Sequence, residues 1–316
     1  MTDTAEQFDG TAMFRQIIGA LEAHGEPPEP RIDVDTQSLV ARYPELEAVH
    51  VQTPIIEGPN GPVDARLYTT GAGTAALVWV HGGAFIAGTL DMPEANWVAL
   101  ELAARGVNVL SVDYRKALRG VRYPVPSDDV RAAWRWALQH ADLLGVPSRE
   151  LHLGGASAGA ALTAALAKRL RDSGGQLPSS MVLVYPLVHA ALPVPTAAAA
   201  AAEALLAAEE RLDPPVIDFI NLNFAGDVAV LTDPHAFAGE GSMEGFPPTY
   251  ILNAEADSLR ASGERFAEQL AAAGVDVEVD FEPGTKHGHL NNPHDGEARA
   301  SIERIAARLL ARTRRS

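Results

Sequence analysis

The residues Gly-Ala-Ser-Ala-Gly at 155–159 place a serine hydroxyl at the centre of a GxSxG motif. They follow an apolar run expected to be a strand, residues 150–154, and precede a helical pattern that begins at residue 158. A sharp strand-to-helix turn of small residues lifts a serine hydroxyl above a sheet as a nucleophile. The helix N–H groups that follow point toward any anion formed there. The pattern therefore predicts Ser157 as a nucleophile; the alternative is an incidental serine that caps a glycine-rich helix start.

A second glycine turn, His-Gly-Gly-Ala-Phe, follows the apolar run Ala-Leu-Val-Trp-Val, so it stands at the end of another expected central strand. Acyl transfer builds negative charge on a carbonyl oxygen, which preorganised backbone N–H groups stabilise. We assign this oxyanion hole to the N–H groups of Gly83, Ala84 and Ala158, with Gly82 shaping the turn. His81 is expected to brace the loop and not to transfer protons.

Two ionisable residues stand where they could complete a triad. Asp257 lies just beyond the expected strand 249–253, and His287 follows the expected strand 275–281. Loops at strand ends commonly carry functional residues, and the chain order serine, acid, histidine is the one described for α/β-hydrolases. We therefore predict that His287 is the general base for Ser157 and that Asp257 orients it.

The neighbouring residues leave alternatives open for both partners of the serine. Glu255 could replace Asp257 as the acid, and Asp257 could simply cap the helix that starts near Leu259. His289 could replace His287 as the base. The sequence alone does not separate these assignments.

A metal site is the other interpretation of the histidines near the C-terminus. His287, His289 and His294 with Asp295 could ligate a metal ion. The segment lacks the helical i, i+4 spacing of a zincin, and no carboxylate-rich oxygen cage accompanies it. We therefore expect no metal and no organic cofactor.

The elements around these motifs alternate between strands and helices, which is typical of an α/β fold with a mostly parallel sheet covered by helices on both faces. The first two expected strands lie too close together for a helical crossover, so they should form an antiparallel start. The expected strands are 48–55, 63–69, 76–80, 107–112, 150–154, 181–185, 249–253 and 275–281, and the expected helices are 92–105, 127–143, 158–172, 259–273 and 296–312.

The segment 275–281 alternates valine and phenylalanine with acidic residues, a period of two that a strand buried on both faces would not have. It is therefore expected at the edge of the sheet. An exposed edge is a possible homodimer seam, although acidic side chains can also serve to prevent pairing.

Two segments stand outside the alternation, residues 1–45 and residues 190–240, and both are expected to form a cap over the top of the sheet. The hydrolytic core is then expected in two parts, 46–189 and 241–316. One domain with an insertion accounts for the 316 residues.

Composition excludes several classes of function. The net charge of −16 repels phosphate backbones and anionic lipid, so nucleic acid is not an expected partner. The chain has no cysteine, which excludes thiol nucleophiles, thiolate metal sites and disulfides. The N-terminus lacks a basic region followed by an apolar run, and no stretch is typical of a membrane span, so a soluble, cytoplasmic protein is expected.

These motifs together resemble those of the hormone-sensitive-lipase-like (family IV) esterases, a branch of the α/β-hydrolase superfamily. The resemblance covers residues 76–290 and rests on motifs in the family's order: HGGAF, SVDYR with YPVP after it, GGASAGA, AEADSLR and KHGH. It implies the α/β-hydrolase fold with a helical cap that shapes the acyl and alcohol pockets. It also implies a triad of Ser157, Asp257 and His287.

The chain departs from the family's pattern at three positions that bear on substrate preference. Ala84 stands where HGGG is common, so a methyl group lies in the expected oxyanion turn. Ala156 stands where an acidic residue often precedes the serine, and His289 replaces a usual phenylalanine. None of these changes removes a triad member.

The resemblance and the residues together predict a serine carboxylesterase that hydrolyses small to medium carboxylic esters through an acyl-enzyme on Ser157. The same machinery serves carbamates, amides, lactones and thioesters, so hydrolysis of a related acyl bond is an alternative. A non-catalytic ligand receptor on the same fold is another, which the presence of His287 disfavours. A peptidase with a propeller is excluded by chain length.

Overall fold

The structure is a computed structural model that describes residues 8–25, 36–71 and 73–313. Its strands form a single mixed sheet. They are β1 (His50–Gln52), β2 (Ile55–Gly58), β3 (Gly61–Thr69), β4 (Ala75–Val80), β5 (Val107–Asp113), β6 (Leu151–Ala156), β7 (Met181–Val184), β8 (Thr249–Ala256) and β9 (Val277–Lys286).

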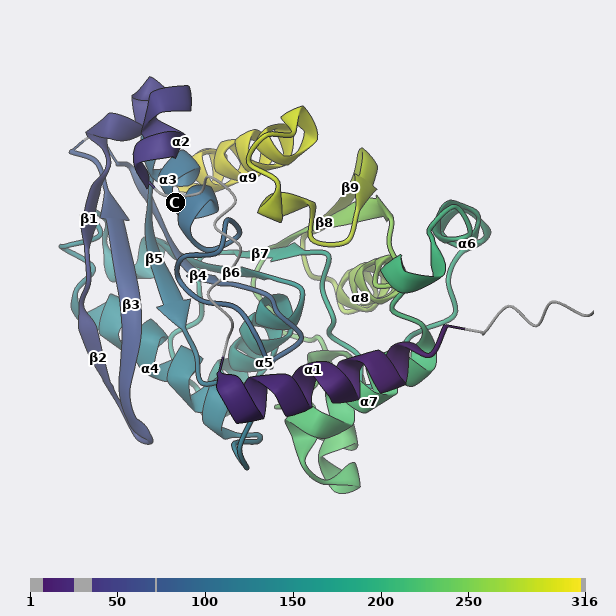
Figure 1. Cartoon of the computed structure of the whole chain (residues 1–316). Coiled ribbons are helices and arrows are strands. Elements are labelled where there is room, and N and C mark those ends of the chain that lie inside the picture. Colours follow the sequence, from purple (N-terminus) through teal and green to yellow (C-terminus); the bar gives the residue numbers. More distant parts are fainter. Residues whose placement is uncertain (1–7, 26–35, 72, 314–316) are drawn as a thin grey trace, which may run out of the picture.

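The helices follow the strands in the alternation expected from the sequence, with additional helices in the segments before β1 and between β7 and β8 (Figure 1). They are α1 (Gly10–His24), α2 (Thr36–Arg42), α3 (Asn96–Ala104), α4 (Val125–Gln139), α5 (Ala158–Ser173), α6 (Ala197–Glu203), α7 (Pro214–Ala225), α8 (Arg260–Ala272) and α9 (Gly296–Thr313).

The strand order is β1-β3-β5-β4-β6-β7-β8-β9, with β2 also paired to β3. All pairs from β5 through β9 are parallel, whereas β1, β2 and β5 are each antiparallel to β3. The mostly parallel sheet, its antiparallel start and the edge position of β9 are therefore confirmed. The carboxyl ends of the central parallel strands meet at one edge of the sheet, where the loops that follow them gather.

Successive residues of the central strands pack on opposite sides, because strand side chains alternate. Leu77 and Trp79 face the core formed with α3 and α9, whereas Val78 and Val80 face the core formed with α4 and α5. A third cluster joins α5 and α8 beside β7 and β8. Burial on both faces explains why these strands appear in the sequence as continuous apolar runs.

The expected single strand 48–55 is wrong, because the segment forms two short strands. β1 ends at Gln52 and β2 begins at Ile55, with Pro54 between them. Proline lacks an N–H group and restricts the residue before it to non-helical conformations, so it interrupts a ladder and is tolerated at a sheet edge. Both pieces still pair with β3.

The acidic residues of β9 do not remain unpaired. Arg304, Arg308 and Arg312 of α9 bind them, with Arg304 on Asp280 and Glu282, Arg308 on Glu278 and Arg312 on Asp276. Helix residues four apart lie on one face, and strand residues two apart lie on one side, so the two series match. The alternation that marked β9 as an edge strand thus also serves its attachment to α9.

The helices outside the alternation lie in two places. α1 packs alongside α7 (Figure 1), and the ring of Phe224 on α7 stacks on Phe85, in the turn after β4, with 4.1 Å between centroids. α2 and the 3₁₀ turn after it instead contribute Leu39 and Leu46 to the core with α3 and α9. No helix among the described residues is long and apolar enough to cross a bilayer.

Candidate active site

Ser157 lies in a sharp turn between β6 and α5 at the carboxyl edge of the sheet. Its φ of 53° is in the left-handed region, which a residue with a side chain rarely adopts and which marks functional turns. The turn closes because its neighbours are small: a Cβ on Gly159 would lie 2.1 Å from the carbonyl oxygen of Val80, and a Cβ on Gly155 would lie 2.6 Å from the backbone of Gly159. The GxSxG spacing is therefore a steric requirement of this turn.

Ser157, His287 and Asp257 form one hydrogen-bonded chain. The Ser157 Oγ and His287 Nε2 atoms are 3.0 Å apart, and His287 Nδ1 is 2.8 Å from Asp257 Oδ2. When Nδ1 carries the proton and donates to the carboxylate, Nε2 is free to accept the serine proton. β9 extends to Lys286, further than the sequence predicted, and so delivers His287 directly to this point.

Asp257 is buried and uses both carboxylate oxygens. Oδ2 faces His287, while Oδ1 accepts the N–H of Leu259 at 2.9 Å, just before α8 begins. Capping the helix and orienting the histidine are therefore not alternatives here, because the same carboxylate does both. The second bond fixes the direction of the first.

The charge of Asp257 sets the protonation of His287. Burial lowers the pKa of His287, but the charge of Asp257, its hydrogen bond and the more distant charge of Glu94 outweigh burial, so the pKa is raised above its usual range. A carboxylate that stabilises the imidazolium is the electrostatic arrangement a general base requires.

The alternative acid and base occupy other partners. Glu255 Oε2 accepts the N–H of Gly284 at 2.7 Å and makes no hydrogen bond to His287. His289 Nε2 is 2.9 Å from Ser301 Oγ, and that hydroxyl donates its proton to Glu282. Burial lowers the pKa of His289 to about 4. The structure therefore brings Asp257 and His287, and not their neighbours, to Ser157.

The histidines considered as metal ligands also separate. His294 Nδ1 lies 2.6 Å from Arg42, remote from the hydrogen bonds of His287 and His289. Within the described ranges, no group of three or more histidine, cysteine or acidic side chains is arranged to hold a metal ion.

The turn after β4 presents unpaired backbone donors. Gly83 and Ala84 have φ of 112° and 52°, and a Cβ on Gly83 would lie 2.1 Å from the carbonyl oxygen of Ala87, so only glycine fits there. In the described part of the chain, the N–H groups of Gly83, Ala84 and Ala158 donate to no backbone or side-chain acceptor. These are the groups that the sequence assigned to the oxyanion hole.

His81 and Tyr114 support this turn from below. His81 is fully buried, its ring stacks on Tyr114 with 4.9 Å between centroids, and its Nδ1 is 2.7 Å from the carbonyl oxygen of Gly82. The Tyr114 hydroxyl donates to the same oxygen at 3.1 Å. Burial, reinforced by Lys116, lowers the pKa of His81, so the ring remains neutral at neutral pH. This is the bracing position expected from the sequence.

Two residues of the site were not found from the sequence. Glu94 is buried and accepts the N–H of Gly82 through Oε1 and the hydroxyl of Tyr185 through Oε2. The Tyr185 ring lies edge-on to His287, with 4.9 Å between centroids. The available signal was a glutamate within the largely apolar segment 92–105, a position where an acid is costly unless it is partnered.

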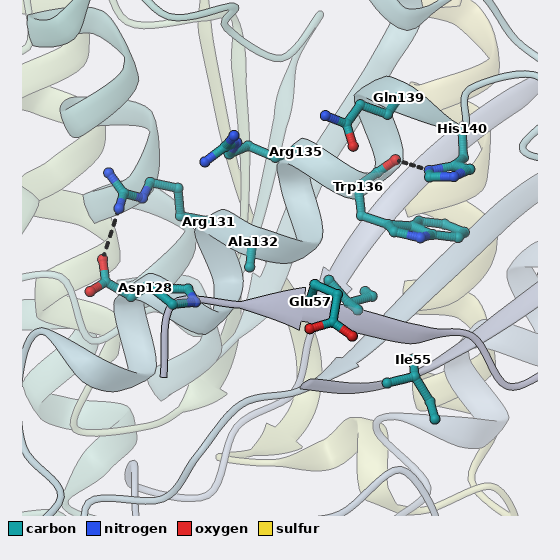
Figure 2. A pocket seen from close by; sticks show the side chains of 11 residues that line it. Ile55, Glu57, Asp128, Arg131, Ala132, Arg135, Trp136, Gln139 and His140 are labelled. Carbon is teal, nitrogen blue, oxygen red and sulfur yellow. Dashed lines mark hydrogen bonds and ion pairs between the residues drawn. The ribbon is translucent and has the colours of Figure 1, made fainter. Parts of the chain in front are cut away.

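A separate cavity of about 500 Å³ lies between β2 and α4. Figure 2 shows Trp136 and Arg135 of α4 on one side of it and Ile55 and Glu57 of β2 on the other. None of the residues hydrogen-bonded to Ser157 or His287 lines this cavity. It is not part of the candidate active site.

Comparisons with known proteins agree with this geometry. A family model described as the alpha/beta hydrolase fold matches residues 77–291. The carboxylesterase NlhH of Mycobacterium tuberculosis is 36% identical over 294 residues, which cover 90% of this chain and 83% of that protein. The esterase LipI of the same organism is 33% identical, over 78% of this chain and 76% of that protein.

A solved structure gives the same result in three dimensions. The hyperthermophilic esterase from the archaeon Pyrobaculum calidifontis superposes with a TM-score of 0.75 at 28% identity, over 95% of this chain and 97% of that one. The matched region contains the turns of Ser157, Gly83, Asp257 and His287 alike.

Proposed function

This chain belongs to the α/β-hydrolase family and is a carboxylic ester hydrolase, and from that premise we propose that Ser157 is its nucleophile, His287 its general base and Asp257 the carboxylate that orients the base. The observation that carries the proposal is the unbroken hydrogen-bonded chain from Ser157 Oγ through the imidazole to Asp257 Oδ2. Geometry of this kind identifies a triad independently of sequence position.

The reaction proceeds in two halves. His287 Nε2 takes the proton of Ser157 as Oγ attacks the ester carbonyl carbon, and the N–H groups of Gly83, Ala84 and Ala158 stabilise the resulting oxyanion. The imidazolium then gives its proton to the departing alcohol, which leaves an acyl group on Oγ. Water activated by the same imidazole attacks the acyl carbon, and the carboxylic acid is released with the serine restored.

The covalent step is tested with diethyl p-nitrophenyl phosphate, which phosphorylates an activated serine and cannot be turned over rapidly. We expect release of one p-nitrophenol per chain, parallel loss of hydrolysis of p-nitrophenyl acetate, and an adduct located on Ser157 by peptide mass spectrometry. Excess p-nitrophenyl acetate should slow the labelling, because both reagents need the same hydroxyl. An adduct on another residue, or labelling without loss of activity, would exclude Ser157.

We further propose that the segment 190–240, together with α1, forms a cap that shapes the substrate pocket. Supporting this, Leu212 donates its N–H to Ser258 beside the triad acid at 3.1 Å, and Lys286, next to His287, is paired with Glu210 at 2.7 Å. We expect the cap to limit substrates to small and medium esters. A series of p-nitrophenyl esters of increasing acyl length, compared by kcat/KM, measures this limit; a flat series would contradict it.

We propose that two copies of the chain associate through the open edge of β9. Its acidic side chains are engaged by arginines of α9, so they do not present an uncompensated negative row to a second copy. Val279 and Phe281 on the same strand remain exposed, by 44% and 36%. An unpaired strand edge with exposed apolar side chains is a favourable surface for strand pairing.

Sedimentation velocity tests this association. The unmodified chain should sediment as a dimer at micromolar concentration, and Val279→Glu should shift it to a monomer while leaving the melting temperature nearly unchanged. Val228→Glu is the matched control, because Val228 is exposed by 68% on a different surface. A monomeric unmodified chain, or an equal effect of both substitutions, would rule out the β9 edge.

A further inference from the structure

Glu94 touches three separate parts of the candidate site. Its Oε1 accepts the N–H of Gly82, in the turn that carries the unpaired donors, and its Oε2 accepts the hydroxyl of Tyr185. Asn291, four residues beyond His287, donates its Nδ2 to Glu94 Oε2 at 3.5 Å and accepts the Glu94 N–H at 3.2 Å. One side chain therefore links the loops that follow β4, β7 and β9.

The position of Glu94 is itself fixed by the core. Its carbonyl oxygen accepts the indole N–H of Trp79 at 2.8 Å, and Trp79 is fully buried in β4. The packing is close: a Cβ on Gly82 would lie 2.8 Å from Glu94 Oε1 and 3.0 Å from the Cβ of Ser157. The carboxylate can therefore hold this turn against the serine with little freedom.

Glu94 differs from the other buried glutamate of the same region. Glu101 on α3 is neutralised by Arg105 and Arg299. Glu94 is 2% exposed, yet no lysine or arginine among the described residues forms an ion pair with it. Burying a carboxylate without a cation is costly, and such a group beside a site where positive charge develops is a candidate for a functional role.

We infer that Glu94 is a positioning residue of the ester hydrolysis: its carboxylate holds the Gly82 turn that carries the oxyanion donors, and its negative charge stabilises the imidazolium of His287 across the ring of Tyr185. This inference rests on the proposed function of Ser157 and His287. It gives Glu94 a role that neither its type nor its place in the sequence indicates.

Four groups surround the His287 ring besides Glu94. Asp257 binds Nδ1, Ser157 lies at Nε2, the Tyr185 ring lies edge-on, and His289 lies on the other side of Tyr185, with 5.3 Å between their ring centroids. Burial lowers the pKa of His287, whereas Asp257 first and Glu94 second raise it. His289 remains neutral, because burial lowers its pKa to about 4. Asp257 and Glu94 are thus the anions that favour the imidazolium.

The two roles of Glu94 are separated by two substitutions. Glu94→Gln has the same shape and retains an oxygen for the Gly82 N–H, but it removes the charge. The rise of kcat/KM with pH, which follows deprotonation of His287, should move to lower pH. Glu94→Asp retains the charge but withdraws it from Gly82 by one methylene. It should leave the pH of that rise in place and lower kcat by about 10²-fold through misplacement of the turn.

Glu101→Gln is the matched control, since it removes a buried glutamate on the neighbouring helix and should leave the pH profile unchanged. A readout independent of activity is the NMR titration of the His287 imidazole in the Ser157→Ala chain, with and without Glu94→Gln. A lower apparent pKa for the imidazole with Glu94→Gln supports the inference.

The failures are distinguishable. If p-nitrophenyl acetate hydrolysis by the unmodified chain does not depend on Ser157, the proposed function fails. If it does depend on Ser157 while Glu94→Gln and the unmodified chain have superimposable pH profiles and imidazole titrations, the electrostatic role of Glu94 is overturned. Full kcat in Glu94→Asp overturns the positioning role. If Glu94→Gln does not fold, Glu94→Asp still tests that role.

Discussion

Ser157→Ala should lower kcat for p-nitrophenyl acetate by about 10⁶-fold, because loss of a triad nucleophile removes the entire covalent route. Residual hydrolysis above the rate in water should persist, since the N–H groups of the oxyanion turn remain in place. The fold should not change: the substitution removes one oxygen and introduces no atom into the tight turn between Gly155 and Gly159. Steady-state kinetics and a thermal melt measure the two effects.

Ser301→Ala is the matched control, because Ser301 is also a buried serine within hydrogen-bond distance of a histidine, His289. Its hydroxyl proton is directed to Glu282, so it is not available for abstraction by the histidine. We expect kcat within a few-fold of the unmodified chain for this variant. Retained activity in Ser157→Ala, or comparable losses in both variants, would show that the nucleophile lies elsewhere.

Asp257→Asn should lower kcat by about 10⁴-fold while retaining the fold. The amide can still accept the Leu259 N–H through its oxygen and so keep the start of α8 in place. Its NH₂ group then faces His287 and favours the imidazole tautomer with the proton on Nε2, which cannot accept the proton of Ser157. Substrate binding is unaffected by this change, so KM should change little compared with kcat.

Glu255→Gln distinguishes the two acids of this loop. Glu255 lies two residues before Asp257 and bonds the backbone of Gly284 instead of His287, so its amide variant should retain nearly full kcat. The reverse pattern, with a large loss in Glu255→Gln and a small one in Asp257→Asn, would transfer the orienting role to Glu255. Stopped assays at several pH values guard against a simple shift of the pH profile.

Local patterns in the sequence were sufficient for the central architecture. Strands buried on both faces must be apolar throughout, which made β4, β6 and β8 recognisable as short uninterrupted runs. The Ser157 turn was recognisable for a related reason: its backbone cannot close around larger residues, so the steric requirement is written in contiguous small residues. Where one short segment contains both the cause and the effect, sequence and structure agree.

Three features depended on segments distant in the chain. The choice of Asp257 over Glu255 and of His287 over His289 follows from where β8 and β9 end and which way each side chain then points. The alternation in β9 acquired its full meaning only with the arginines of α9 beside it.

The role inferred for Glu94 follows from the same physical reason. Its sequence neighbours are those of an ordinary helix start, whereas its partners Gly82, Tyr185 and Asn291 come from three other loops. Hydrogen bonds and Coulomb interactions act over a few ångströms of space, regardless of separation along the chain. The amino-acid order by itself determined the sheet, the turns and the candidate side chains; the packing of distant strands decided which of those side chains meet.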